Sequence, residues 1–136
     1  MKAWLKTRLK PLVDFKETPH ELGLAFGFGV FLGIIPGTGA IAAAACAAFL
    51  RLNLPLMVAG ALLTNPVTTP FVYGASYLIG KRVLGSFVPA WSGFRIVLQT
   101  LTGNLILAVG LGLVGYLVIF CFVGLLRLRR GSSYPA

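Results

Sequence analysis

Two short polar motifs interrupt two long apolar segments of this chain, and both motifs have residue types that could bind a ligand inside a membrane. The apolar segments run from Leu22 to Leu50 and from Leu52 to Gly80, have equal length and carry no charged residue. A broken helix exposes backbone groups that only a cavity, a partner or a ligand can satisfy. Paired breaks at corresponding places therefore predict a substrate or ion site within a membrane protein. The first motif is Pro36, Gly37, Thr38 and Gly39, and the second is Thr64, Asn65, Pro66, Val67, Thr68, Thr69 and Pro70.

The residues around the breaks favour an anionic ligand. Helices that begin after the breaks, at about Ala40 and about Phe71, would present free N–H groups and the positive ends of their dipoles. No carboxylate follows Glu21 in the chain, whereas Arg51 lies between the two segments. A phosphate or a phospholipid headgroup suits this inventory better than a metal ion.

The predicted substrate-binding residues come from both breaks and from the short stretch between the segments. We expect Arg51 to act as the counter-ion, and Gly37 and Gly39 to form a hinge. The neutral ligands would be the hydroxyl and amide groups of the second break. An alternative stays open, in which these polar side chains only cap helix ends and bond one another. The full set is Pro36, Gly37, Thr38, Gly39, Arg51, Asn53, Thr64, Asn65, Pro66, Thr68 and Thr69.

His20 and Glu21 are candidate proton-coupling groups beside the start of the first apolar segment. Their neighbours give a more economical explanation for Glu21. Thr18 can cap a helix, Pro19 suits the first helical position, and Glu21 lies three residues after the cap, which completes a capping box. The pattern predicts a helix that begins at Pro19.

The composition places the chain in a membrane. Hydrophobic residues make up 57% of the 136 residues and charged residues only 11%. The stretch from Leu105 to Leu126 has no strongly polar side chain, and about 20 apolar residues span a bilayer core. Of the Lys and Arg residues, five precede Glu17 and three follow Leu126. Because these charges flank the apolar segments, we expect both termini to be cytoplasmic. We do not expect the protein to bind nucleic acid.

These observations predict an all-α integral membrane protein. Residues 1–17 would form a basic amphipathic interfacial helix, and residues 18–136 a single membrane domain. Two broken or re-entrant helical segments, at about 19–52 and 53–84, would be followed by one long C-terminal transmembrane helix. Each half of a broken segment is too short to span about 30 Å, so each segment is either a kinked crossing or a re-entrant hairpin. The sequence leaves this choice open.

Small and polar residues predict how the helices pack. Four glycines of the first segment form two small-xxx-small pairs that would let another helix approach closely. The pairs are Gly23 with Gly27 and Gly29 with Gly33. Four polar residues near the start of the last helix are interpreted as a polar edge rather than a buried network: Gln99, Thr100, Thr102 and Asn104.

Several motifs together resemble a small bacterial integral-membrane family, domain of unknown function 2062. The resemblance covers roughly residues 18–85, and the Asn-Pro motif of the second break is its most specific part. It implies a bacterial cytoplasmic membrane protein, and related domains fused to glycosyltransferases hint at lipid-linked sugar metabolism. It implies no activity. The motifs are Thr18-Pro19-His20, the glycine-spaced helix, Ile35-Pro36-Gly37, Arg51-Leu52-Asn53-Leu54-Pro55, Thr64-Asn65-Pro66 with Thr68 and Pro70, and Tyr73, Tyr77 and Gly80.

We therefore expect a small homo-oligomeric transporter or lipid-translocating protein of the inner membrane. Its ligand would be the anionic headgroup of a polyprenyl phosphate or a phospholipid, held between the two breaks. The alternative is a scaffold that binds an envelope or glycosyltransferase partner through its glycine faces. An enzyme is not expected, because the chain has one His, no metal-ligand spacing and no carboxylate pair, and no cofactor is implied.

Overall fold

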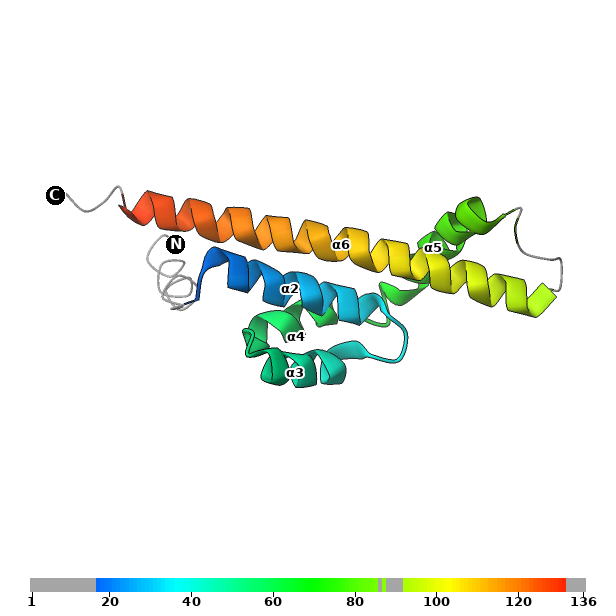
Figure 1. Cartoon of the computed structure of the whole chain (residues 1–136), viewed down its shortest axis with the longest axis horizontal. Helices are drawn as coiled ribbons and strands as arrows, with labels where there is room; N and C mark the ends of the chain where they lie inside the picture. The colour runs from blue at the N-terminus through cyan, green and yellow to red at the C-terminus, as the bar shows by residue number, and fades with distance from the viewer. Residues whose placement is uncertain (1–16, 86, 88–91, 132–136) are drawn as a thin grey trace.

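The computed structural model is helical throughout the part of the chain that it describes, which is residues 17–85, 87 and 92–131. Figure 1 shows one long helix with the shorter helices gathered along it. No strand occurs in the described residues. The predicted interfacial helix at 1–17 lies outside them, apart from Glu17. The helices are α2 (Pro19–Ile34), α3 (Gly39–Leu50), α4 (Leu54–Leu62), α5 (Thr69–Leu84) and α6 (Ser92–Gly131).

Helix α2 begins at Pro19, as predicted, because local hydrogen bonds satisfy its free N–H groups. The Glu21 N–H donates to Thr18 Oγ1 over 3.2 Å, and the Thr18 N–H donates to Glu21 Oε2 over 2.7 Å. This reciprocal pair is a capping box. At its other end the helix stops at Ile35, whose extended backbone suits the residue before Pro36.

The two glycine pairs of α2 pack against two different helices. A Cβ added at Gly27 would lie 2.6 Å from the Gly112 carbonyl oxygen of α6. One added at Gly29 would lie 2.0 Å from the Met57 carbonyl oxygen of α4. The prediction of close helix approach is confirmed, and the partners are helices of the same chain. These contacts bury Gly23, Gly27 and Gly29 and leave Gly33 half-buried.

Helix α6 is the longest helix, and the shorter helices lie along it (Figure 1). Helix α2 runs antiparallel along its C-terminal half, and α5 runs antiparallel along its N-terminal half. The α5–α6 contact is also very close. A Cβ added at Gly80 would lie 1.6 Å from the Gln99 carbonyl oxygen, and a Cβ added at Gly103 would lie 1.7 Å from the Ser76 carbonyl oxygen. Helices α2 and α5 thus meet end to end along α6.

Helices α3 and α4 pack against the other side of α2. Their shared core consists of small side chains and one Met: Ala25, Ala43, Ala47, Met57 and Ala61. The outward side of α3 is apolar and uncovered, because Ile41 and Phe49 are each 88% exposed. Large apolar side chains at the surface usually mark contact with lipid or with another protein.

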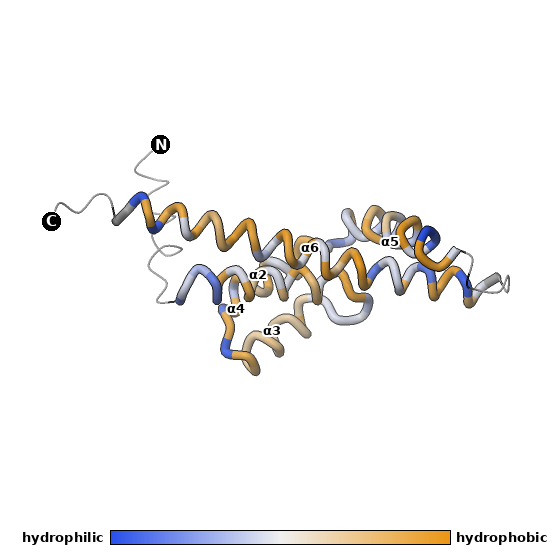
Figure 2. Tube along the Cα trace, turned by 45° about the horizontal axis from the view of Figure 1, so that its top comes forward, coloured by the Kyte–Doolittle hydropathy of each residue, from blue (hydrophilic) through white to orange (hydrophobic). Residues whose placement is uncertain are grey.

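Among the described residues, one helix is long and apolar enough to cross a membrane, within Gly93–Arg129 of α6. The 40 residues of α6 reach about 60 Å. In Figure 2 apolar residues follow α3 and much of α6, whereas hydrophilic residues mark both ends of α6. The all-helical architecture with two interrupted segments is confirmed, and the interruptions lie at 35–38 and 63–68.

Candidate functional site

The first break, residues 35–38, turns the chain with the help of two glycines, one within the break and one at the first residue of α3. Gly37 and Gly39 have φ angles of 87° and 62°, which other residue types rarely adopt. A Cβ at either glycine would meet nothing within 4 Å, so the positive φ alone requires glycine there. This turn reverses the chain from α2 into α3.

The carbonyl groups at the end of α2 are largely satisfied by side chains. Thr38 Oγ1 donates to the Leu32 carbonyl and, over 2.8 Å, to that of Ile35. Asn104 of α6 donates from Nδ2 to the Ile34 carbonyl over 2.9 Å. These bonds satisfy the carbonyls of Leu32, Ile34 and Ile35, whereas those of Gly33, Pro36 and Gly37 accept no hydrogen bond among the described residues.

The donors at the same break are not occupied. The N–H groups of Gly39, Ala40 and Ile41 find no acceptor among the described residues, and the Thr38 side chain makes no capping bond to α3. The first N–H groups of a helix carry its positive partial charge. The start of α3 consequently presents donors without acceptors.

Asn65, Thr68 and Thr69 bond to the backbone of the second break, residues 63–68, whereas the Thr64 hydroxyl group does not. Asn65 Oδ1 accepts from the N–H groups of Val67 and Thr68, at 2.9 and 3.1 Å. Thr68 Oγ1 accepts from the Asn65 N–H over 2.9 Å and donates to the Leu63 carbonyl over 2.9 Å. Thr69 Oγ1 donates to the Asn65 carbonyl over 2.7 Å. These bonds match the alternative in which the polar side chains cap and bond one another.

A cavity of about 240 Å³ lies between the two breaks, and we name it the break cavity. It brings together the whole first motif with parts of the second motif and of α5. Thr64 and Tyr73 contribute hydroxyl groups for which no hydrogen-bond partner is found in the described residues. The lining residues are Gly33, Ile34, Ile35, Pro36, Gly37, Thr38, Gly39, Thr64, Thr69 and Tyr73.

Several predicted site residues do not line this cavity. Asn65, Pro66 and Thr68 belong to the second break but are not among its lining residues. Arg51 and Asn53 lie at the opposite end of α3, whose 12 residues separate them from Gly39 by about 18 Å.

Arg51 and Asn53 have local structural roles at that opposite end. Arg51 is exposed and adopts a left-handed conformation with φ of 54° as it ends α3. Asn53 Oδ1 caps α4 by accepting from the Leu56 N–H over 3.0 Å. Its Nδ2 donates to Glu17 Oε2 over 2.8 Å. Both residues are thus beside the start of α2, far from the break cavity.

His20 and Glu21 also lie at the end that carries Glu17. His20 Nδ1 lies 2.7 Å from the Tyr116 hydroxyl oxygen. The hydrogen bonds from the Thr18 N–H and hydroxyl hold the pKa of Glu21 below its ordinary value. Glu21 therefore stays ionised near neutral pH, as a capping group requires.

The interpretation of the polar residues of α6 as a polar edge is wrong for two of them. Gln99 and Asn104 are each only 2% exposed. Asn104 Oδ1 accepts from the Ser76 hydroxyl over 3.0 Å, so this residue joins α5 and the end of α2. Gln99 Nε2 has no hydrogen-bond partner among the described residues. The i, i+4 spacing of small and polar residues on both helices, Ser76 with Gly80 and Gln99 with Gly103, was a usable signal for this contact.

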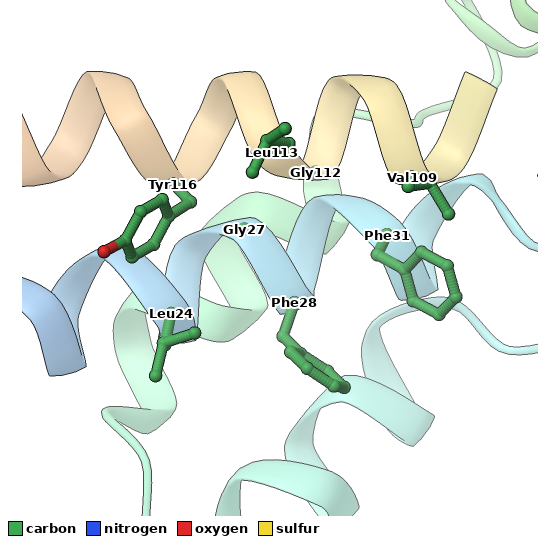
Figure 3. A pocket seen from close by; sticks show the side chains of 8 residues that line it. All are labelled: Leu24, Gly27, Phe28, Phe31, Val109, Gly112, Leu113 and Tyr116. Carbon is green, nitrogen blue, oxygen red and sulfur yellow. The ribbon is translucent and has the colours of Figure 1, made fainter. Parts of the chain in front are cut away.

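Two apolar cavities flank the contact between α2 and α6. The Phe28 groove, about 360 Å³, lies on one side, and Figure 3 shows its side chains from both helices. The Leu63 cavity, about 370 Å³, lies on the other side. The Phe28 groove is lined by Leu24, Gly27, Phe28, Phe31, Val109, Gly112, Leu113 and Tyr116. The Leu63 cavity is lined by Phe26, Val30, Ile34, Leu63, Thr64, Val72, Leu111, Val114, Gly115 and Val118.

The fold and the cavities define an all-helical protein with two interrupted segments and one helix that is suited to crossing a membrane. In the part of the chain described, no group of three or more His, Cys, Asp or Glu side chains could hold a metal ion. The chain belongs to the family described as uncharacterized protein conserved in bacteria (DUF2062), whose profile matches residues 2–132. The resemblance seen in the sequence is confirmed and extends over almost the whole chain. Neither a curated protein nor a solved structure matches it.

Proposed function

We propose that this protein is a small oligomeric transporter or lipid-translocating protein of the bacterial inner membrane, and that it binds an anionic headgroup in the break cavity. The observation that carries this proposal is a group of donors without acceptors at that cavity. They are the Gly39 N–H at the start of α3 and the hydroxyl groups of Thr64 and Tyr73, none of which has a partner among the described residues. A site that offers donors and a positive helix end selects anions.

The distribution of charge supports placing α6 across a bilayer. Its charge-free stretch, Ile96 to Leu126, is about 46 Å long, close to the total thickness of a bilayer with its headgroups. Arg95 lies at one end, and its Nη2 donates to the Gly85 carbonyl over 2.8 Å. Arg127 lies at the other end and donates to the Glu17 carbonyl. Both described ends of the chain therefore lie on one side.

That side would be cytoplasmic, because five Lys and Arg residues precede Glu17 in the sequence. In this orientation the α2–α3 pair enters from the cytoplasm, turns at the first break and returns to Arg51. Helices α4 and α5 together form one broken crossing, and α6 forms the return crossing. The break cavity then lies nearer the outer surface, since Asn104 is about 14 Å along α6 from Arg95 and about 35 Å from Arg127.

The character of the lining favours binding and transport over catalysis. No His, Cys, Asp or Glu lines the break cavity, so it contains no evident nucleophile or general base. Oligomers are expected because large apolar side chains such as Ile41 and Phe49 are uncovered. The scaffold alternative would use such exposed side chains, since Gly23, Gly27 and Gly29 are buried inside the molecule.

Removal of the two free hydroxyl groups tests the anion site. We expect Thr64→Val combined with Tyr73→Phe to lower the affinity for inorganic phosphate by roughly 10- to 100-fold, the usual worth of hydrogen bonds to a charged group. Isothermal titration calorimetry of the protein in detergent would measure the affinity. The matched control is Thr100→Val with Tyr77→Phe, because neither residue lines the cavity. Equal phosphate binding by both double variants would contradict the proposal.

A further inference from the structure

We propose that the ligand of the break cavity is an amphiphile, and that the Leu63 cavity holds its hydrocarbon chain. This inference rests on the proposed function, because the break cavity must first bind an anionic head. The two cavities share two wall residues, Ile34 and Thr64. The break cavity and the Leu63 cavity therefore lie next to each other at those two side chains.

The shape and chemistry of the Leu63 cavity suit a single hydrocarbon chain. Thr64, which it shares with the break cavity, is its one residue with a polar side chain. The α6 part of its wall extends from Leu111 to Val118, about 10 Å along the helix axis. The cavity is open on one side, since Leu63, Val114 and Val118 are each more than half exposed, and a chain lying in it would contact the walls on both sides.

The position of the cavity selects an amphiphile over a free anion. A free anion would use only the break cavity and would leave the adjoining apolar space unfilled. Apolar volume alone does not identify the chain site. The Phe28 groove is nearly as large as the Leu63 cavity but shares no residue with the break cavity. Of the two apolar cavities described above, the Leu63 cavity is the one that adjoins the break cavity and can take a chain attached to a head there.

The direction of the chain follows from the helix contacts. The head would lie at the level of Asn104, which bonds the Ile34 carbonyl. From there the chain would run along α6 toward Val118, and so toward the end that carries Arg127. In the orientation proposed above the head faces outward, and the chain runs from about the midplane toward the cytoplasmic side, because Leu111 lies midway between Arg95 and Arg127. The predicted ligand class is thus a lipid with an anionic phosphate-type head.

Two adjacent residues of α6 allow a matched experiment. Val114 lines the Leu63 cavity and is 54% exposed, and Leu113 lines the Phe28 groove and is 59% exposed. Trp at position 114 would fill the proposed chain site, whereas Trp at position 113 would fill the groove on the other side. The probes are octyl phosphate, inorganic phosphate and 1-octanol, measured by native mass spectrometry in one detergent at fixed concentration.

The wild-type protein should bind octyl phosphate at least about tenfold more tightly than inorganic phosphate, since about two methylene groups removed from water give that factor. Val114→Trp should lower octyl phosphate affinity by about tenfold, by removing the same contribution, and leave inorganic phosphate binding unchanged. Leu113→Trp should change neither. Val118→Trp, also in the Leu63 cavity, should repeat the effect of Val114→Trp if that variant is unstable.

The outcomes separate the two proposals. If octyl phosphate and inorganic phosphate bind alike, or if the Trp variants at 113 and 114 behave alike, the chain site is wrong while the anion site stands. If 1-octanol binds as tightly as octyl phosphate, and the double variant of Thr64 and Tyr73 binds both as the wild type does, the anion site itself is wrong and the inference falls with it.

Discussion

The first break turns the chain through glycine backbone, whereas the second turns it through side-chain hydrogen bonds. Gly37 and Gly39 supply positive φ angles and leave the N–H groups that follow without acceptors. Asn65 and Thr68 instead close their turn with bonds to each other's backbone. Asn65 and Thr68 therefore act as structural residues, and the second break offers the cavity the Thr64 hydroxyl, whereas the first break offers it the Gly39 N–H. The comparison assigns ligand binding chiefly to the first break and shape to the second.

The largest effect should come from Asn104, which supports the first break from outside. Asn104→Ala leaves the buried Ile34 carbonyl without its donor and removes one of the two acceptors of the Ser76 hydroxyl, which also bonds to the Val72 carbonyl. We expect a loss of about 1–3 kcal/mol in unfolding free energy, measured by denaturant titration with circular dichroism in detergent. Thr100→Ala is the control, because its hydroxyl bonds only to the Ile96 carbonyl one turn earlier. Equal losses in both variants would show that Asn104 does not hold the break.

A smaller effect is expected at the second break. Asn65→Ala removes the acceptor for two backbone N–H groups and should cost about 1 kcal/mol, as loss of a helix cap does. Inorganic phosphate affinity should stay at the wild-type value, because Asn65 does not line the break cavity. Denaturant titration and calorimetry on the same preparation measure the two quantities. A large loss of phosphate affinity with unchanged stability would reverse the roles assigned to the two breaks.

The smallest effect should appear at Arg51, far from both breaks. Arg51→Gly relieves a left-handed conformation and should raise the unfolding free energy by about 0.5 kcal/mol. Phosphate affinity should not change, since about 18 Å of α3 separates this residue from Gly39. A marked fall in phosphate affinity would restore Arg51 as the counter-ion, for example across the interface of an oligomer.

Features set by neighbouring residues could be predicted from the sequence. The capping box of Thr18 and Glu21 and the two interruptions follow from local rules for caps, Pro and Gly, and the structure has them where expected. The close-packing role of the α2 glycines also follows from their spacing. Their division between α4 and α6 does not, because it depends on how the finished helices are arranged.

The candidate site was predictable only in part, for the same reason. Its glycine motif could be found because positive φ angles favour glycine at each position independently. The sequence predicts Arg51 at the site because Arg51 lies between the two apolar segments. In the structure α3 is unbroken, so Arg51 lies at the end of α3 that is far from the break cavity. Asn104 was missed because its partners, Ser76 and Ile34, are 28 and 70 residues away in the chain.

The contact between Gly27 and Gly112 has a consequence for biosynthesis. Helix α2 packs against a helix that the ribosome makes much later, since Gly112 follows Gly27 only after α3, α4 and α5. Contacts of such long sequence separation form slowly, and a nascent chain leaves the glycine surface of α2 bare in the meantime. A chain that stops short of Gly112 would keep that surface bare and be open to proteolysis.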